Sequence, residues 1–161
     1  MALRQIRVDG DPILRKRSKE VKEIDERLKV LLGDMVETMR EANGIGLAAP
    51  QVGILKRVIV VDVGEQPIMA INPEIVESEG CVEDIEGCLS VPHMRGTVER
   101  PEKIKVKFLD ENGEEVVMEP AGYLARIFCH EIDHLNGILY TDLAKDVYRD
   151  DIEDDYGDEE L

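Results

Sequence analysis

The sequence predicts one α+β domain in which mixed or antiparallel strands pack around a central helix bearing an H-E-x-x-H motif, with an amphipathic helix near the N-terminus. Several segments have strand character and only two have helical periodicity, without regular βαβ alternation. A length of 161 residues leaves room for one core. We expect a folded domain over residues 1–145 and a frayed acidic tail over 146–161.

The first predicted element is the amphipathic helix, over Glu26–Met39. Leucine, methionine and valine recur there at helical spacing, Asp25 can cap the first turn, and Asn43-Gly44 supplies a stop signal. An apolar stripe of this kind is more often core than a ligand surface. We therefore expect this helix to pack against the core.

Strands are predicted next in the chain. The runs Arg57–Val63 and Ile68–Val76 are rich in β-branched residues. The run Lys103–Leu109 alternates polar and apolar residues, and the turn signal Asn112-Gly113 leads from it into Glu115–Met118. This last pattern predicts a hairpin with one face in water.

The second predicted helix opens at Pro120, which suits a first helical turn, and closes at Asn136-Gly137. Its expected inward stripe consists of Leu124, Ile127, Phe128, Ile132 and Leu135. The helix therefore contains the motif His130-Glu-Ile-Asp-His134 and directs it toward the interior.

The H-E-x-x-H motif carries the clearest chemical signal. At 3.6 residues per turn, His130 and His134 lie one turn apart on one helix face, with Glu131 beside them. Two imidazoles can bind one metal ion, and the carboxylate can take a proton from water. Two surface histidines are the alternative, but these positions continue the inward stripe. The residues themselves leave the third ligand open among Cys81, Cys88, His93 and the carboxylates.

Composition excludes several classes of partner. The 36 acidic and 20 basic residues give a net charge of −16, which opposes any general attraction to nucleic acid or anionic membranes. No apolar run approaches the ~20 residues of a membrane span, and the N-terminal residues lack the apolar segment of a signal peptide. Three cysteines cannot all pair, which fits a reducing compartment. We expect a cytoplasmic protein.

Three segments together resemble the signature motifs of the peptide deformylase family, in the family's order and at similar separations. They are Gly44-Ile-Gly-Leu-Ala-Ala-Pro-Gln51, Glu86-Gly-Cys-Leu-Ser90 and His130-Glu-Ile-Asp-His-Leu-Asn-Gly137. H-E-x-x-H alone occurs in many metalloproteases, but the three segments together are specific. The likeness extends from about Ile6 to Leu143.

The resemblance implies a metal-dependent hydrolase that removes the N-formyl group from the N-terminal methionine of newly synthesised polypeptides, with residues 1–145 as its catalytic domain. Cys88, His130 and His134 would bind the metal, and Glu131 would be the general base for a metal-activated water. The family favours Fe²⁺ as the native ion. A thiolate with two imidazoles would also accept Zn²⁺, Ni²⁺ or Co²⁺.

The resemblance also implies residues that bind the substrate. Gly44 and Gly46 bracket Ile45, and their missing side chains would let an extended peptide pair with this backbone, although an ordinary glycine loop is the alternative. The Gln51 amide and the Leu89 backbone N–H would stabilise an oxyanion. The remaining substrate-binding candidates are Gly87 and, with Ile45 in a pocket for the methionine side chain, Tyr123, Arg126 and Ile127.

Glu86 and Arg95 match two charged positions of the family. We expect them to pair and to steady the loop that holds Cys88, unless each is simply solvated. Cys129 departs from the family, which usually has glutamine at this position, and helical geometry directs Cys129 away from the metal and into the core.

The implied partner is a nascent peptide beginning with N-formyl-methionine. Ribosome proximity follows from such a substrate, but the acidic ending Asp150–Asp155 would be repelled by ribosomal RNA and makes docking through the tail doubtful. The sequence leaves the host open, including an organelle or a virus-encoded copy.

Two other functions compete with a deformylase. An H-E-x-x-H endopeptidase would normally take its third ligand downstream of the helix, yet no histidine follows His134. A binding module could keep the metal site and hold formyl-peptides without turnover, but Glu131 beside an open metal site favours catalysis.

Overall fold

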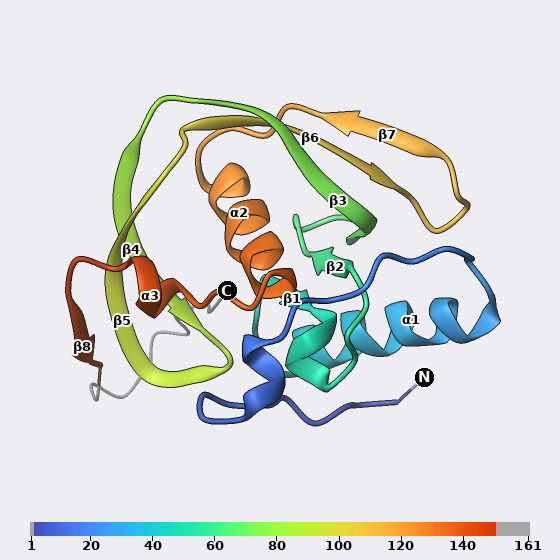
Figure 1. The fold of residues 1–161 in the computed structure, drawn as a ribbon, viewed down its shortest axis with the longest axis horizontal. Helices are drawn as coiled ribbons and strands as arrows, with labels where there is room; N and C mark the ends of the chain where they lie inside the picture. The colour runs from blue at the N-terminus through green and yellow to red at the C-terminus, as the bar shows by residue number, and fades with distance from the viewer. Residues whose placement is uncertain (1, 151–161) are drawn as a thin grey trace.

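The computed structural model describes residues 2–150, which form an α+β domain with two antiparallel sheets. One sheet has the strand order β1-β2-β3-β6-β7 and the other the order β4-β5-β8. The helix α2 (Tyr123–Leu135) lies between them in the middle of the molecule (Figure 1). Side chains of α2 can therefore contact both sheets.

The five-stranded sheet contains the four strands that the sequence patterns predict and one, β1, that they do not. Its members are β1 (Gly46–Ala48), β2 (Val58–Val61), β3 (Ile68–Glu79), β6 (Lys103–Leu109) and β7 (Glu115–Met118). The β6–β7 hairpin is confirmed with the predicted bounds, and Gly113 takes a φ of 81° in its turn, which favours glycine. Ile104, Val106 and Phe108 point from β6 into the core, as the alternation requires.

The three-stranded sheet consists of β4 (Val82–Cys88), β5 (Val91–Arg100) and β8 (Val147–Arg149). A two-residue turn, Leu89-Ser90, joins β4 to β5, and β8 pairs with Met94–Gly96 of β5. Strand β8 falls in the segment expected to fray from residue 146, so its three residues belong with the folded domain. The rest of the predicted tail, 151–161, lies outside the described residues.

Helix α1 (Glu26–Glu41) packs on the face of β2 opposite to α2. The side chain of Asp25 caps α1 by accepting a hydrogen bond from the Leu28 backbone N–H at 2.9 Å. Strand β2 is buried on both faces: Val58 and Val60 join the α1 cluster, while its alternate residues join the α2 cluster. This layering places α2 in the interior.

Helix α2 begins three residues later than Pro120, where the sequence pattern opened it. The Pro120 carbonyl accepts a hydrogen bond from Ile104 N at 3.0 Å, and Gly122 N donates to Glu102 O at 2.8 Å. Residues 120–122 thus pair with the chain at the start of β6, and Gly122, at φ 64°, turns the chain into the helix. Tertiary hydrogen bonds replace the first helical turn.

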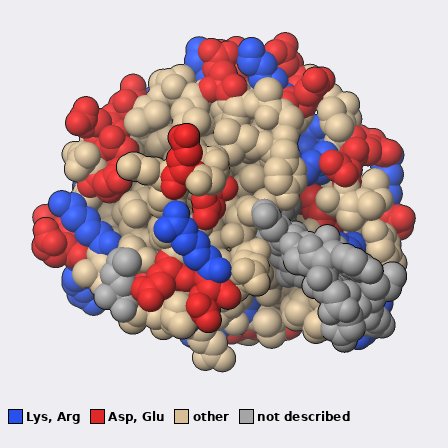
Figure 2. Space-filling model, turned by 180° about the vertical axis from the view of Figure 1, so that it is seen from behind, with Lys and Arg blue, Asp and Glu red and all other residues tan. Residues whose placement is uncertain are grey.

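The remaining helices are short: η1 (Pro12–Arg15), η2 (Ala49–Val52) and α3 (Tyr140–Leu143). Across residues 2–150, no helix has the length and apolar character needed to cross a membrane. Figure 2 shows one face of the surface, on which acidic and basic side chains are interspersed around the rim.

Candidate active site

Two elements bring the three candidate ligands together. Cys88 ends β4, and α2 carries His130 and His134 one turn apart. All three side chains are buried, and one ligand atom from each lies within 4.8 Å of the other two. The Cys88 Sγ is 3.3 Å from His134 Nε2. By position, Cys88 is therefore the candidate for the third ligand that the residues alone left open.

This group fits a divalent transition-metal ion. A thiolate and two imidazoles form a suitable donor set with room for a further ligand. The Nε2 atom of His130 and both carboxylate oxygens of Glu131 are buried without a hydrogen-bond partner among the described residues. A buried polar atom without a hydrogen-bond partner destabilises the fold, so these atoms are suited to contacting a metal ion and a water molecule.

Glu131 is fully buried beside the ligand group and faces β1. A Cβ atom built on Gly46 would lie 2.5 Å from Glu131 Oε2, so any larger residue at position 46 would collide with the carboxylate. Burial raises the pKa of Glu131 well above its usual value, and the neighbouring charge of Glu86 adds to this shift. A carboxyl group with a raised pKa is suited to exchanging protons near neutral pH.

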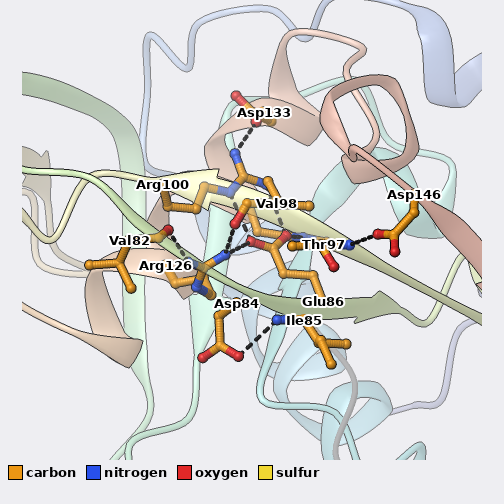
Figure 3. A network of polar contacts seen from close by, with 11 residues as sticks. Val82, Asp84, Ile85, Glu86, Thr97, Val98, Arg100, Arg126, Asp133 and Asp146 are labelled. Atoms are coloured by element: carbon orange, nitrogen blue, oxygen red, sulfur yellow. Dashed lines mark hydrogen bonds and ion pairs between the residues drawn. The ribbon is translucent and has the colours of Figure 1, made fainter.

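Glu86 contacts the His130 ring at the nitrogen that faces away from the candidate metal position. Its Oε1 lies 2.9 Å from His130 Nδ1. Arg100 binds both oxygens of Glu86, at 2.9 and 3.0 Å (Figure 3). Arg126 Nη1 donates to Glu86 Oε2 at 2.6 Å, and Asp133 accepts from Arg100 at the same distance. Contact with Glu86 fixes Nδ1 as the protonated ring nitrogen and leaves Nε2 available to a metal.

The charge of Glu86 is maintained against its environment. Burial alone would raise the pKa of this carboxyl, but the hydrogen bonds from His130 and Arg100 outweigh burial and hold the pKa well below its ordinary value. In return, Glu86 raises the pKa of Arg100 against the opposing effect of burial. These hydrogen bonds therefore favour the ionised carboxylate over the neutral acid.

The expected pair between Glu86 and Arg95 is replaced by the pairs with Arg100 and Arg126. The register of β4 and β5 sets Glu86 opposite Gly96, so Glu86 shares a sheet face with Arg100, four residues along β5, and not with Arg95. Arg95 instead donates from Nε to Asp150 Oδ2 at 3.3 Å. Its guanidinium also passes over Gly87, where an added Cβ would collide with it.

Hydrogen-bond donors gather around Cys88. Gln51 is fully buried in η2: its Oε1 accepts from Ala48 N at 2.9 Å, and its Nε2 donates to Ser90 Oγ at 3.0 Å and lies 3.7 Å from Cys88 Sγ. Ser90 N donates to the same sulfur at 3.4 Å. Leu89 lies in the turn between Cys88 and Ser90. Amide groups therefore surround one side of the candidate metal position.

A cavity of about 740 Å³ opens beside the start of α2. Gly44, Ile45, Tyr123 and Ile127 line it together with Leu124, residues around the end of α1 and residues after β2. None of the three candidate ligands lines this cavity, but residues that line it are close to the site in sequence. Ile45 precedes Gly46, the glycine that faces Glu131, and Ile127 is three residues before His130.

Arg126 does not line this cavity, in contrast to the expectation from the sequence. A step of one residue turns a helix by 100°, and that step directs Arg126 toward β4 and β5 instead. There it is buried and donates to the carbonyls of Val82 and Val98 at 2.7 and 3.0 Å as well as to Glu86. Its role is to support the network of Figure 3.

The other cysteines and His93 stand apart from the ligand group. Cys129 is packed in the core, as expected, and burial raises the pKa of its thiol to about 11. Cys81 is exposed, with its Sγ 3.3 Å from Glu99 Oε2. His93 is exposed on β5. Among the described residues, the only group of three such side chains close enough to hold a metal ion is therefore Cys88 with the two histidines.

Sequence reasoning missed three residues that act around the site: Ser90, Arg100 and Tyr140. Ser90 follows Leu89 within a segment already singled out, so its polarity was a usable signal. Arg100 and Tyr140 have no local signal, because strand pairing brings Arg100 to Glu86 and the chain after α2 sets the Tyr140 ring 6.0 Å from that of His130.

Comparison with known proteins gives a consistent family. The family model described as polypeptide deformylase matches residues 3–150. The chain is 58% identical over 142 residues to peptide deformylase 1 of Clostridium acetobutylicum, which covers 88% of this chain and 95% of that protein. It is 61% identical over 142 residues to a peptide deformylase of Acetivibrio thermocellus, covering 88% and 84%. The crystal structure of peptide deformylase from Thermotoga maritima superposes with a TM-score of 0.87 at 50% identity, covering 89% and 99%.

Proposed function

The chain belongs to the peptide deformylase family and is an enzyme of that kind, and on this premise we propose how its own residues remove the formyl group from nascent polypeptides. The observation that carries the mechanism is a buried carboxylate, Glu131, beside a buried group of one cysteine and two histidines. Hydrolysis of the formamide would release formate and a free methionine amine. The substrate would be met in the cytoplasm, during protein synthesis.

Cys88 Sγ and the Nε2 atoms of His130 and His134 would hold one divalent ion, with Fe²⁺ as the favoured native metal and Zn²⁺, Ni²⁺ or Co²⁺ as compatible substitutes. When bound, such an ion supplies Lewis acidity, which lowers the pKa of a water molecule and polarises a carbonyl. Glu86 keeps His130 in the required orientation through Nδ1.

Glu131 would move the proton. Its carboxylate takes a proton from the attacking water as the new C–O bond forms, and returns it to the amine nitrogen as the C–N bond breaks. The burial that raises its pKa brings the carboxyl closer to the range in which it can both accept and donate. Gly46 leaves the space that this carboxylate occupies.

Gln51 Nε2 and the backbone N–H of Leu89 would donate to the oxygen that becomes negative during attack. Both lie next to Cys88, and the Ala48 amide holds the Gln51 side chain by its Oε1, so the Nε2 end is fixed in direction. Donors fixed in advance stabilise the transition state more than the ground state. Replacing such a donor typically costs ~100-fold or more in rate.

The substrate would lie across β1 and enter the adjoining cavity. Backbone groups at Gly44–Gly46 are suited to pairing with an extended peptide. Ile45, Tyr123 and Ile127 give the cavity of about 740 Å³ an apolar portion that a methionine side chain can fill.

The direct test is formate release from a short formyl-methionyl peptide by Fe²⁺-loaded protein prepared without oxygen. The matched control peptide carries an acetyl group, which preserves the amide but adds a methyl at the reacting carbon. We expect rapid release of formate from the formyl peptide and no release of acetate from the control peptide. Tight binding of formyl-peptide by metal-loaded, folded protein without formate release would favour the non-catalytic module, and cleavage inside the peptide would favour an endopeptidase.

Gln51→Ala tests the donor role separately from binding. We expect kcat to fall ~100-fold or more with a smaller change in KM, because the lost hydrogen bond acts mainly on the transition state. Kinetics of formate release across substrate concentrations separates the two constants. Ser90→Ala, which removes the hydroxyl that Gln51 Nε2 contacts but keeps the amide itself, is the control and should lose less activity. Equal losses would remove the assigned role of Gln51.

A further inference from the structure

Six basic residues gather around one cleft without carboxylate partners. They are Lys16, Arg17, Lys19, Lys22, Lys56 and Arg57. Among residues 2–150, none of the six has a carboxylate oxygen within 4.0 Å, whereas most basic residues elsewhere do, such as Arg40 with Asp62 and Lys103 with Glu119. In a chain of net charge −16, this is a local excess of positive charge.

Backbone hydrogen bonds hold together the two segments that carry these basic residues, 16–22 and 56–57. Lys19 N donates to Leu55 O at 3.0 Å, and Arg57 N donates to Lys19 O at 2.9 Å. Ser18 N donates to Leu135 O at 2.8 Å, which ties the same segment to the end of α2. Figure 1 shows the segment after η1 passing beside the C-terminal end of α2 and β2. The positive charges are therefore fixed on an ordered backbone.

The cleft has a volume of about 960 Å³, and Arg17, Lys19, Lys22 and Arg57 line it. Arg17 Nη1 and Arg57 Nη2 both donate to Asn136 Oδ1, at 2.8 and 3.0 Å. Two guanidinium groups thus share one neutral oxygen. Burial and the charge of Arg17 lower the pKa of Arg57, and Glu20 offsets only part of this repulsion between the two guanidinium groups. An anion entering the cleft would relieve this repulsion.

Three carboxylates also line the cleft and reduce its positive charge. Asp133 is already engaged by Arg100 at 2.6 Å, so its charge is largely compensated. Glu20 and Glu74 remain, against four cations. The two flanking lysines, Lys16 and Lys56, are exposed and add to the excess at the rim.

We propose that this basic cleft binds the phosphate backbone of RNA. The choice of RNA among polyanions rests on the proposed function, because nascent polypeptides leave a particle built largely of RNA. Phosphate contacts by Lys and Arg need no base recognition, and the cleft offers donors of both kinds. The overall charge of −16 confines any such contact to this one region, in keeping with the absence of a general attraction to nucleic acid.

A membrane surface is the less suitable polyanion. Binding in a membrane interface combines basic residues with apolar side chains that enter the lipid. Among the described residues, the large exposed apolar side chains nearest in sequence to the two basic segments are Val8, Val30 and Val63, and none lies within 16–22 or 56–57. A concave site also suits a projecting phosphate better than a flat layer of headgroups.

The test compares two triple variants of the full-length protein. Lys19→Gln/Lys22→Gln/Lys56→Gln alters the basic cleft, and Lys103→Gln/Lys105→Gln/Lys107→Gln alters β6, where each lysine already has a glutamate partner. Both lower the net charge by three, so they differ only in position. The readout is fluorescence anisotropy of a labelled RNA hairpin across salt concentrations, with unfolding temperature and formate release from a short peptide measured alongside.

We expect the wild type and the β6 variant to bind RNA alike, and the cleft variant to bind at least ~10-fold more weakly. For the cleft variant, the slope of log K against log salt concentration should be shallower by about two. Formate release from the short peptide should stay unchanged in both variants, so failure of RNA binding is separable from failure of the proposed catalysis. Equal weakening by both variants would overturn the proposal. Preferential binding of phosphatidylserine vesicles or polyglutamate over RNA would also overturn it.

Discussion

Helices α1 and α2 follow the same rule of periodicity and yet serve different purposes. The apolar stripe of α1 packs Leu28, Leu32 and Met35 into a cluster made of hydrocarbon side chains. The inward faces of α2 hold, beside Phe128 and Leu135, the buried polar side chains Arg126, His130, Glu131 and His134. Burying a polar group is costly unless it has a partner. The comparison teaches that spacing decides which residues are buried, and residue chemistry decides whether burial stabilises the fold or builds a site.

The largest expected effect comes from removing a ligand on α2. His130→Ala should abolish metal binding and formate release together, because two remaining ligands hold an ion poorly. Metal content by elemental analysis after gel filtration, together with activity, measures both. Cys129→Ala is the matched control, since it changes the adjacent residue on the core side and should keep metal and turnover. Retained metal in a folded His130→Ala protein would remove His130 from the ligand set.

Next in size is Glu131→Gln, which keeps the shape of the side chain and removes its basicity. We expect kcat to fall by about 10²–10⁴ with metal content unchanged, as for loss of a general base. Circular dichroism and metal analysis verify that fold and ion remain. Turnover close to that of the wild type would show that another group takes the proton.

A smaller effect is expected from Glu86→Gln. Glu86 contacts the ligand candidate His130 but is not itself a ligand candidate. The neutral amide would orient His130 less firmly and leave Arg100 and Arg126 without their shared carboxylate. Metal affinity should fall ~10–100-fold, as for other residues that support a ligand, and the free energy of unfolding should fall as well. Competition with a chelator gives the affinity. Glu83→Gln, on the exposed part of β4, is the control: its ion pair with Lys145 is exposed, so both quantities should change little.

The smallest effect on catalysis is expected from α1. Leu32 is fully buried, so Leu32→Ala should lower the free energy of unfolding by roughly 2–5 kcal/mol through lost burial and a cavity. Urea denaturation measures this change. The kcat per folded molecule should stay the same, because α1 contributes no group to the ligand set. A large fall in kcat at full folding would mean that α1 packing positions β1 and its glycine.

Much of the fold was accessible from local patterns. The β6–β7 hairpin could be predicted from alternation and the turn Asn112-Gly113, because both signals are local and the strands are neighbours in sequence. Strand β1, of three residues, was not predicted, and neither were β4, β5 and β8. Their exposed stretches carry little alternation, as in β4, whose first four residues are all exposed, and their pairing depends on partners elsewhere in the chain.

The start of α2 shows the same limit. Proline favours a first helical turn, and the sequence therefore placed the helix start at Pro120. The actual start at Tyr123 results from hydrogen bonds between residues 120–122 and the chain around β6, which local propensity cannot register. Tertiary pairing outweighed a weak local preference.

The sequence by itself determined the chemistry of the site. The spacing of His130 and His134 fixed two candidate ligands and a neighbouring carboxylate, since a helix sets that geometry within one turn. The family's motifs added Cys88 and Gln51. These inferences rest on short-range geometry and on recurring sequence patterns.

Only the tertiary structure decided which charges meet. Strand register pairs Glu86 with Arg100 and not with Arg95. The orientation of α2 directs Arg126 toward Glu86 and not into the cavity. The same applies to the basic cleft, where a backbone bridge joins Lys19 to Lys56 across the chain. Residues distant in sequence meet through sheet register and packing, and neither is encoded in any single segment.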